Sequence, residues 1–107
     1  MLAFGALSPY RAKPSYRHTV EDSVYVKAGY RGKGLGGLIL DELVTLARAR
    51  DHHAVVARIT GGNRASLRLH ERHGFFRAGL EREIAFKLGA WLDVVTMQRL
   101  LEPAGRP

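Results

Sequence analysis

Residues 19–40 read TVEDSVYVKAGYRGKGLGGLIL, and the expected fold follows from this stretch. Its first eight residues alternate in polarity and include three valines, which is the period-two pattern of a β-strand. Asp22 interrupts the apolar face of that strand, and this predicts a bulge or a strand edge near it. From Leu35 to Ala47, apolar residues recur at three- and four-residue spacing, which predicts a helix of about four turns with one apolar stripe.

Five glycines crowd residues 29–37, between the predicted strand and the predicted helix. Glycine lets the backbone turn so that successive N–H groups point into one concavity. The amino terminus of the helix adds partial positive charge, and Lys27, Arg31 and Lys33 add full charges at the rim. The stretch therefore predicts a site for phosphate oxygens, and a tight turn that merely tolerates glycine is the plainer alternative.

The rest of the chain predicts further strands and one shorter helix. The predicted strands cover residues 3–7, 54–59, 75–76, 81–88 and 92–98, and a loop covers residues 10–18. A turn at residues 60–63 caps a helix over residues 64–73, which Gly74 closes. The order strand, strand, helix, strand, helix, strand, strand implies a right-handed crossover and predicts a mixed α/β sheet. We expect one domain over residues 1–101, followed by a loose tail at residues 102–107.

The composition excludes several classes of protein. A hydrophobic fraction of 46% with 25% charged residues excludes a disordered chain. No apolar run approaches the roughly 20 residues of a membrane helix, and the absence of cysteine excludes disulfides and thiolate metal sites. We expect a cytoplasmic protein that does not bind membranes. The net charge of +7 favours an anionic partner, but the basic residues form no single block, which argues against nucleic acid.

Three kinds of phosphate-binding loop compete for the glycine stretch. The nucleoside triphosphate loop fails, because Gly34 rather than Ser or Thr follows Lys33. Gly-x-Gly-x-x-Gly from Gly32 to Gly37 fits the dinucleotide fingerprint formally, but its first glycine does not directly follow the strand. No acidic residue ends the next strand, so an NADP site read by Arg58 is a minor alternative.

The third kind is Arg31-x-x-Gly34-x-Gly36, which resembles the pyrophosphate loop of the GNAT-superfamily N-acetyltransferases. Downstream, residues 63–75 look like the second helix motif of that superfamily. The chain is more closely similar to the phosphinothricin and methionine sulfoximine N-acetyltransferases. The matching stretches are Tyr16-Arg17-His18-Thr19-Val20-Glu21, Ser23-Val24-Tyr25-Val26, Leu69-His70-Glu71 and Lys87-x-Gly89-x-Trp91-x-Asp93-Val94. The resemblance implies a GNAT-like mixed sheet that transfers an acetyl group from acetyl-CoA to the amine of a small amino-acid-like acceptor.

The resemblance also implies roles for individual residues. Glu21 is the expected base for the acceptor amine, and His70 is expected to protonate the departing sulfur. The backbone N–H of Val26 is expected to polarise the thioester carbonyl. The implied cofactor-binding residues are Val24, Val26, Arg31, Gly32, Lys33, Gly34, Gly36, Gly37, Asn63 and Ser66. The implied acceptor-binding residues are Tyr10, Lys13, Tyr16 and Arg17; the family favours arginine where Lys13 stands, and lysine lacks its planar two-point grip.

Plainer interpretations stay open for several of these residues. Glu21 alone is typical of a solvated strand carboxylate, His70 of a packing histidine, and Asn63 of a helix cap. His52, His53, His70 and His73 are accompanied by no carboxylate-rich or HExxH pattern, so we expect no metal.

The resemblance begins only after the family's N-terminal third, which contributes one wall of the acceptor pocket. We therefore expect a homo-oligomer, or a partner chain that completes the sheet. Three hypotheses follow: an N-acetyltransferase, a non-catalytic CoA-binding half-domain, and a basic nucleic-acid-binding module.

Overall fold

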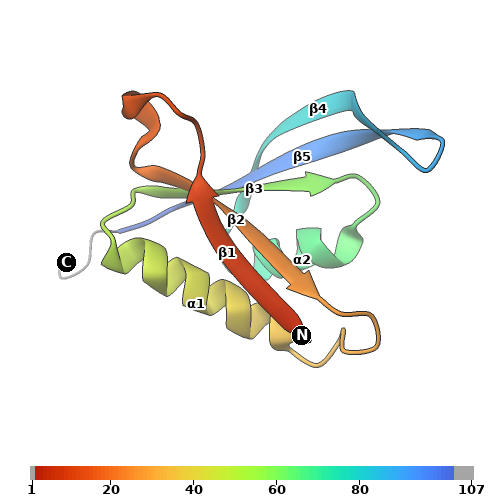
Figure 1. The fold of residues 1–107 in the computed structure, drawn as a ribbon, viewed down its shortest axis with the longest axis horizontal. Helices are drawn as coiled ribbons and strands as arrows, with labels where there is room; N and C mark the ends of the chain where they lie inside the picture. Colours follow the sequence, from red (N-terminus) through yellow and green to blue (C-terminus); the bar gives the residue numbers. More distant parts are fainter. Residues whose placement is uncertain (1, 103–107) are drawn as a thin grey trace.

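The structure is a computed structural model that describes residues 2–102, and its five strands form one sheet (Figure 1). In chain order the elements are β1 (Ala3–Pro9), the 3-10 turn η1 (Pro14–Tyr16), β2 (Thr19–Val26), α1 (Leu35–Ala49), β3 (Ala54–Thr60), α2 (Arg64–Arg72), β4 (Phe76–Lys87) and β5 (Ala90–Leu100). The order in the sheet is β1-β2-β3-β5-β4, with β2 and β3 parallel and the other neighbours antiparallel. The predicted mixed α/β sheet is confirmed. Neither helix within residues 2–102 has the length and apolar character needed to cross a membrane.

One long strand replaces the two strands that were predicted over residues 75–76 and 81–88. This strand, β4, shifts its register against β5 twice. Near the second shift Glu83 adopts a φ of 51°, and its amide donates to Oδ1 of Asp93 at 2.8 Å. The side-chain acceptor replaces a lost ladder bond, so the strand bends without ending.

Smaller differences occur at the loop and the chain end. The loop expected over residues 10–18 contains η1, which Pro14 begins, because proline is preset for a first helical position. α2 ends at Arg72, and His73 is its C-cap. Of the expected tail, Glu102 accepts a hydrogen bond from Arg48 Nε at 3.3 Å, and residues 103–107 lie outside the described residues.

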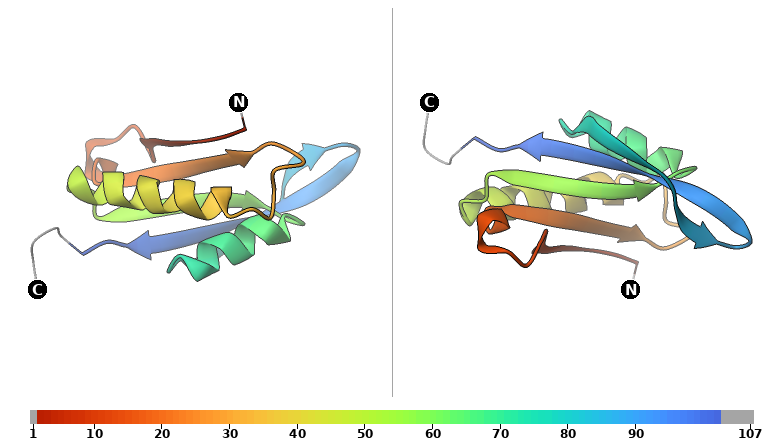
Figure 2. Two further views of the ribbon diagram at one scale, coloured as in Figure 1. Left: turned by 90° about the horizontal axis from the view of Figure 1, so that it is seen from below. Right: turned by 90° about the horizontal axis from the view of Figure 1, so that it is seen from above.

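One face of the sheet carries the core and both helices. Figure 2 shows α1 lying along this face. The buried cluster joins the apolar stripe of α1 to the central strands and consists of Val20, Leu40, Val44, Ala47, Val55, Ala57, Ile59, Phe75, Met97 and Leu101. Asp22 lies two residues beyond Val20 and so points to the same face, where it contacts His70 of α2. The opposite face, which carries Glu21 and Arg58, has no helix among the described residues.

β2 and β3 pair over only three positions, from Thr19 opposite Ala54 to Glu21 opposite Val56. The pairing of β2 with β1 continues without a shift as far as Val26. The bulge that Asp22 predicted is therefore absent. The predicted strand edge is present on one side only, because from Asp22 onward β2 has no pairing with β3. The sheet opens at this point.

The hairpin of β4 and β5 extends beyond the rest of the sheet (Figure 2). Large apolar side chains are exposed along it, namely Leu80, Ile84, Phe86, Leu88 and Trp91. Exposed apolar side chains that gather on one surface indicate a contact with another molecule.

Gly5 marks the closest approach between β1 and α1. A Cβ at this position would collide with Cγ2 of Ile39 and lie 3.0 Å from Cδ1 of Leu43. We expect Gly5→Ala to lower the free energy of unfolding by about 1–3 kcal/mol, because α1 must move away from the sheet. Urea denaturation followed by circular dichroism measures the change. In the control Gly79→Ala, the new Cβ meets nothing within 4 Å; equal losses from both substitutions would contradict the close packing of α1.

Candidate functional site

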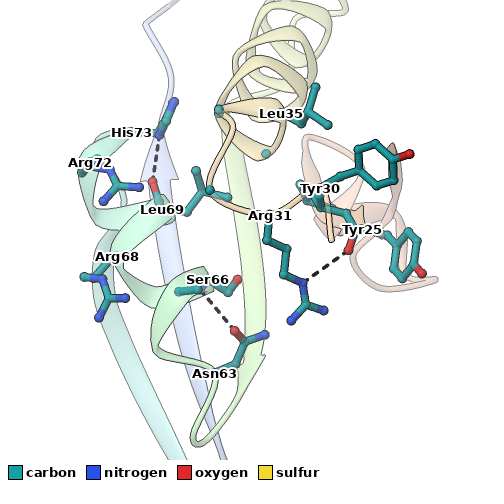
Figure 3. A pocket seen from close by; sticks show the side chains of 17 residues that line it. Tyr25, Tyr30, Arg31, Leu35, Asn63, Ser66, Arg68, Leu69, Arg72 and His73 are labelled. Atoms are coloured by element: carbon teal, nitrogen blue, oxygen red, sulfur yellow. Dashed lines mark hydrogen bonds between the residues drawn. The ribbon is translucent and has the colours of Figure 1, made fainter. Parts of the chain in front are cut away.

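A cavity of about 660 Å³ lies between the glycine loop, the end of β2 and α2 (Figure 3). Three arginines border it: Arg31 from the loop, and Arg68 and Arg72 from α2. The described residues that line the cavity include no carboxylate. A cavity edged by positive charge alone favours an anionic ligand.

The glycine loop presents backbone donors to this cavity. Gly34 is the N-cap of α1 and has a φ of 81°, in the left-handed region that glycine adopts without strain. Within the described residues no side chain caps α1, so its first-turn amides keep their donors available. Arg31 Nε donates to the carbonyl of Val26 at 3.4 Å, which holds the loop against the end of β2. Amides, helix dipole and guanidinium together form an anion site.

The open edge of β2 adds two more backbone donors. The amide of Lys27 donates to the carbonyl of Leu2 at 2.7 Å, toward β1. Because successive amides of a strand point to opposite edges, the amides of Val24 and Val26 face the edge toward β3. Both valines line the cavity, beyond the last pair with β3. These amides can therefore bind a ligand that enters between the strands.

The first turn of α2 forms the facing wall. Asn63 Oδ1 accepts a hydrogen bond from the Ser66 amide at 3.2 Å, so the capping interpretation of Asn63 is confirmed. Both residues also line the cavity. The cap thus fixes two polar side chains where β2 and α2 face each other.

A second cavity, of about 240 Å³, lies where β2 and β3 part. The charged and titratable residues that line it are Glu21, Asp22, Arg58 and His70, and it shares Val24, Asn63 and Ser66 with the larger cavity. Two carboxylates and an imidazole thus lie in a cavity that shares lining residues with the larger one. This is the arrangement that a proton transfer beside a bound ligand requires.

His70 is a buried member of a hydrogen-bonded chain that crosses from β2 to α2. Its Nε2 lies 3.0 Å from Oδ1 and 3.1 Å from Oδ2 of Asp22, and its Nδ1 lies 2.8 Å from the carbonyl oxygen of Ser66. The side chains are 3% and 2% exposed for His70 and Asp22. Both partners of the ring are acceptors, so the imidazolium, with an N–H on each nitrogen, satisfies both contacts.

The pKa of His70 is raised above its ordinary value of 6.5. Burial of the ring is the largest single influence on this pKa and lowers it. The hydrogen bond to Asp22, the charge of Asp22 and the hydrogen bond to the Ser66 carbonyl raise the pKa, and together they outweigh burial. The site therefore favours the proton-carrying form of His70.

Comparison with known proteins decides the family. The sequence profile of the Acetyltransferase (GNAT) family matches residues 1–75. The chain belongs to the GNAT acetyltransferase family. The resemblance inferred from the glycine loop is confirmed.

Relatives of this GNAT domain are similar over nearly the whole chain. It is 43% identical over 103 residues to an L-methionine sulfoximine/L-methionine sulfone acetyltransferase of Pseudomonas aeruginosa, a match that covers 96% of this chain and 60% of the relative. It is 43% identical over 101 residues to a phosphinothricin N-acetyltransferase of Streptomyces coelicolor, covering 94% of this chain and 59% of the relative. The chain thus spans about 60% of the length of these relatives.

Solved structures show the same fold. A GNAT-superfamily phosphinothricin acetyltransferase from Sinorhizobium meliloti, in complex with acetyl-CoA, matches with a TM-score of 0.92 at 37% identity, covering 99% of this chain and 58% of that one. An N-acetyltransferase from Staphylococcus aureus matches with a TM-score of 0.93 at 35% identity, covering 94% and 61%. The predicted GNAT-like sheet is confirmed.

The GNAT domain brings together most of the residues that the sequence singled out. Nine of the ten expected cofactor-binding residues line the larger cavity, and Lys33 does not; its ammonium lies 5.7 Å from the centre of the Tyr30 ring. The two expected catalytic residues both line the smaller cavity. The expected acceptor residues, Tyr10, Lys13, Tyr16 and Arg17, line neither cavity and lie on the loop between β1 and β2.

The sequence analysis missed three residues of this site. Arg68 and Arg72 stand four residues apart and so share one face of α2, a spacing that could have placed them together. Asp22 predicted only a bulge or a strand edge, and its buried contact with His70 gave no local signal. Arg58, the residue of the NADP alternative, lines the smaller cavity and pairs with Glu81 instead of bordering the loop.

The raised pKa of His70 makes the stability of the GNAT domain depend on pH. The stabilisation from the protonated ring is fully present below pH 6.5 and is lost as the pH rises through the higher folded-state pKa. We expect the free energy of unfolding to fall across this window by up to about 1.4 kcal/mol per pH unit.

Urea unfolding between pH 5.5 and 8.5 tests this, with His70→Gln as the reference that lacks the titrating ring. The wild-type protein should lose stability more steeply than the variant. Parallel pH profiles of the two proteins would contradict the assignment to His70.

Proposed function

We propose that this GNAT domain transfers an acetyl group from acetyl-CoA to the amine of a small amino-acid-like acceptor. The observation that carries the proposal is the cavity at the amino terminus of α1, where loop amides and three arginines face a ligand site without carboxylates. The names of the relatives support the acceptor class, and the acetyl-CoA complex of a similar structure supports the cofactor. A nucleic-acid-binding role has less support, because these three arginines gather around one cavity and the relatives are named as acetyltransferases.

The residues fit the shape and charge of acetyl-CoA. The amides of residues 31–37 and Arg31 hold the pyrophosphate, and Arg68 and Arg72 add positive charge for the other phosphate. Val24 and Val26, with Asn63 and Ser66 opposite them, hold the pantetheine arm. Bound in this way, acetyl-CoA supplies an acetyl group activated as a thioester.

Three groups of this chain then carry out the transfer. Glu21 takes the proton of the acceptor amine, directly or through water, so that the nitrogen lone pair can attack the acetyl carbonyl. The amide of Val26 donates to the carbonyl oxygen on which negative charge develops. His70 supplies the proton that the departing thiolate needs.

The path of that last proton runs through Ser66. His70 is buried and does not line the larger cavity, whereas Ser66 lines both cavities, and its Oγ lies 3.5 Å from Nδ1 of His70. Ser66 passes its hydroxyl proton to the sulfur and takes a proton from His70. Solvent then returns a proton to the ring of His70. On the acceptor side, Tyr10, Lys13, Tyr16 and Arg17 bind the carboxylate and side-chain oxygens.

The decisive substitution is Glu21→Gln, which keeps the size of the side chain and removes the base. We expect the affinity for acetyl-CoA to stay within about twofold of wild type, while thiol release with an amine acceptor falls by about 100-fold. Calorimetry measures the first, and a thiol-release assay with amino acids, methionine sulfoximine, methionine sulfone and phosphinothricin measures the second. The control is Glu42→Gln, the same change at an exposed position of α1.

Two outcomes would contradict the proposal. No binding of acetyl-CoA at millimolar concentration would refute the cofactor site itself. Binding without thiol release for any acceptor, unchanged in Glu21→Gln, would favour the non-catalytic CoA-binding domain.

We also propose that a second copy of this chain, or a partner chain, completes the sheet. The exposed apolar side chains of the β4–β5 hairpin support this, as does the outer position of β1 in the sheet. We expect light scattering to show an oligomer, which Leu88→Glu, at a position 95% exposed, should weaken. A monodisperse monomer would contradict self-association. The cytoplasmic location stays a prediction.

A further inference from the structure

α2 is held to the sheet by a polar contact. Among the residues of α2, His70 alone is buried, while Leu67 and Leu69 are half-buried against the core and Arg68 and Arg72 line the cavity. The buried ring packs edge-on against Phe75, with 4.9 Å between the ring centres. Its two nitrogens bind Asp22 on β2 and the carbonyl of Ser66 on α2 itself. Since the apolar contacts of α2 are only half-buried, the position of the helix depends in part on what His70 binds.

Asp22 occupies the point where the sheet opens. It follows directly on Glu21, the last residue of β2 that pairs with β3. Both of its carboxylate oxygens lie within 3.1 Å of Nε2 of His70. A chain of contacts thus runs from the carboxylate of Asp22 on β2 through the ring to Ser66 on α2, and both elements also contribute residues to the larger cavity.

Other charged groups near the ring do not replace this contact. Glu21 and Arg58 line the same small cavity from β2 and β3, but Arg58 is bound to Glu81, and Glu21 points to the opposite face of β2 from Asp22. Asp41 of α1 contacts the neighbouring His73 instead, with 3.3 Å between its Oδ1 and Nε2 of that ring. Asp22 is thus the carboxylate that binds His70 among the described residues.

We propose that Asp22 is a positioning residue: by binding His70 it sets the first turn of α2, with Asn63 and Ser66, at the right distance from the open edge of β2. Asp22 keeps the imidazolium in place. The ring in turn fixes the distance between β2 and α2 across the cavity that receives acetyl-CoA. This role is additional to those of Glu21 and His70. The part of its test that measures acetyl-CoA binding rests on the proposed function.

The test compares Asp22→Asn with Asp41→Asn. Both substitutions remove one negative charge and one carboxylate partner of a histidine, but Asp41 is 68% exposed and lines neither cavity. We expect Asp22→Asn to lower the pKa of the His70 ring, read by NMR titration without ligand, and to weaken acetyl-CoA binding about tenfold in calorimetry. Asp41→Asn should leave the His70 pKa unchanged and the affinity within about twofold.

A third measurement uses the wild-type protein and so does not depend on the folding of a variant. Hydrogen exchange of the α2 amides, corrected for intrinsic rates, should lose protection as the pH rises through the measured pKa of His70, while the β3 amides do not. Unchanged His70 titration and acetyl-CoA affinity in Asp22→Asn, or α2 protection that is independent of pH, would overturn the proposal. If wild type does not bind acetyl-CoA, the proposed function fails, and the two ligand-free measurements still decide the role of Asp22.

Discussion

The early parting of β2 and β3 is the constraint on which the rest of the site depends. Three paired positions hold the two parallel strands together, and beyond Glu21 the edge of β2 has no β3 partner. Backbone donors buried without partners cost free energy, so an opened sheet needs something to bind them. A bound ligand arm can do so for Val24 and Val26. The opening therefore removes pairs from the sheet and leaves backbone amides that a ligand can bind.

The fold gathers part of the chain's positive charge at one place. A net charge of +7 alone is compatible with nucleic acid, an acidic surface or a phosphorylated cofactor. The structure brings Arg31, Arg68 and Arg72 to the edge of one cavity, although the first is more than 30 residues from the others in sequence. Positive charge combined with helix-terminal amides suits a phosphorylated small ligand better than a long polyanion, because the loop and the three arginines border the same cavity.

Local patterns predicted the fold well, and contacts between distant residues account for what they missed. Alternation over residues 19–26 and the apolar stripe of α1 gave β2 and α1 almost to the residue, because each pattern is read within one element. The glycine loop predicted the place of the larger cavity for the same reason. The continuity of β4 depends on Asp93, ten residues from Glu83, and no period reveals such a contact. Asp22 predicted a bulge or a strand edge but not an ion pair, because its partner His70 lies 48 residues away in the sequence.

An ion pair, Asp22 with His70, lies where β2 and β3 part, and its presence there needs a physical reason. Burying a carboxylate and an imidazolium costs desolvation that their attraction repays only with good geometry, and apolar side chains of similar volume often stabilise a fold as well or better. Stability alone therefore does not explain Asp22 and His70. An apolar pair would hold α2 by shape and could slide, whereas hydrogen bonds at both ring nitrogens fix the distance and the rotation of the helix. The same pair keeps a proton next to Ser66, at the junction of the two cavities. The contact between Asp22 and His70 thus both fixes the helix and holds a proton, whereas an apolar pair would hold the helix less rigidly and carry no proton.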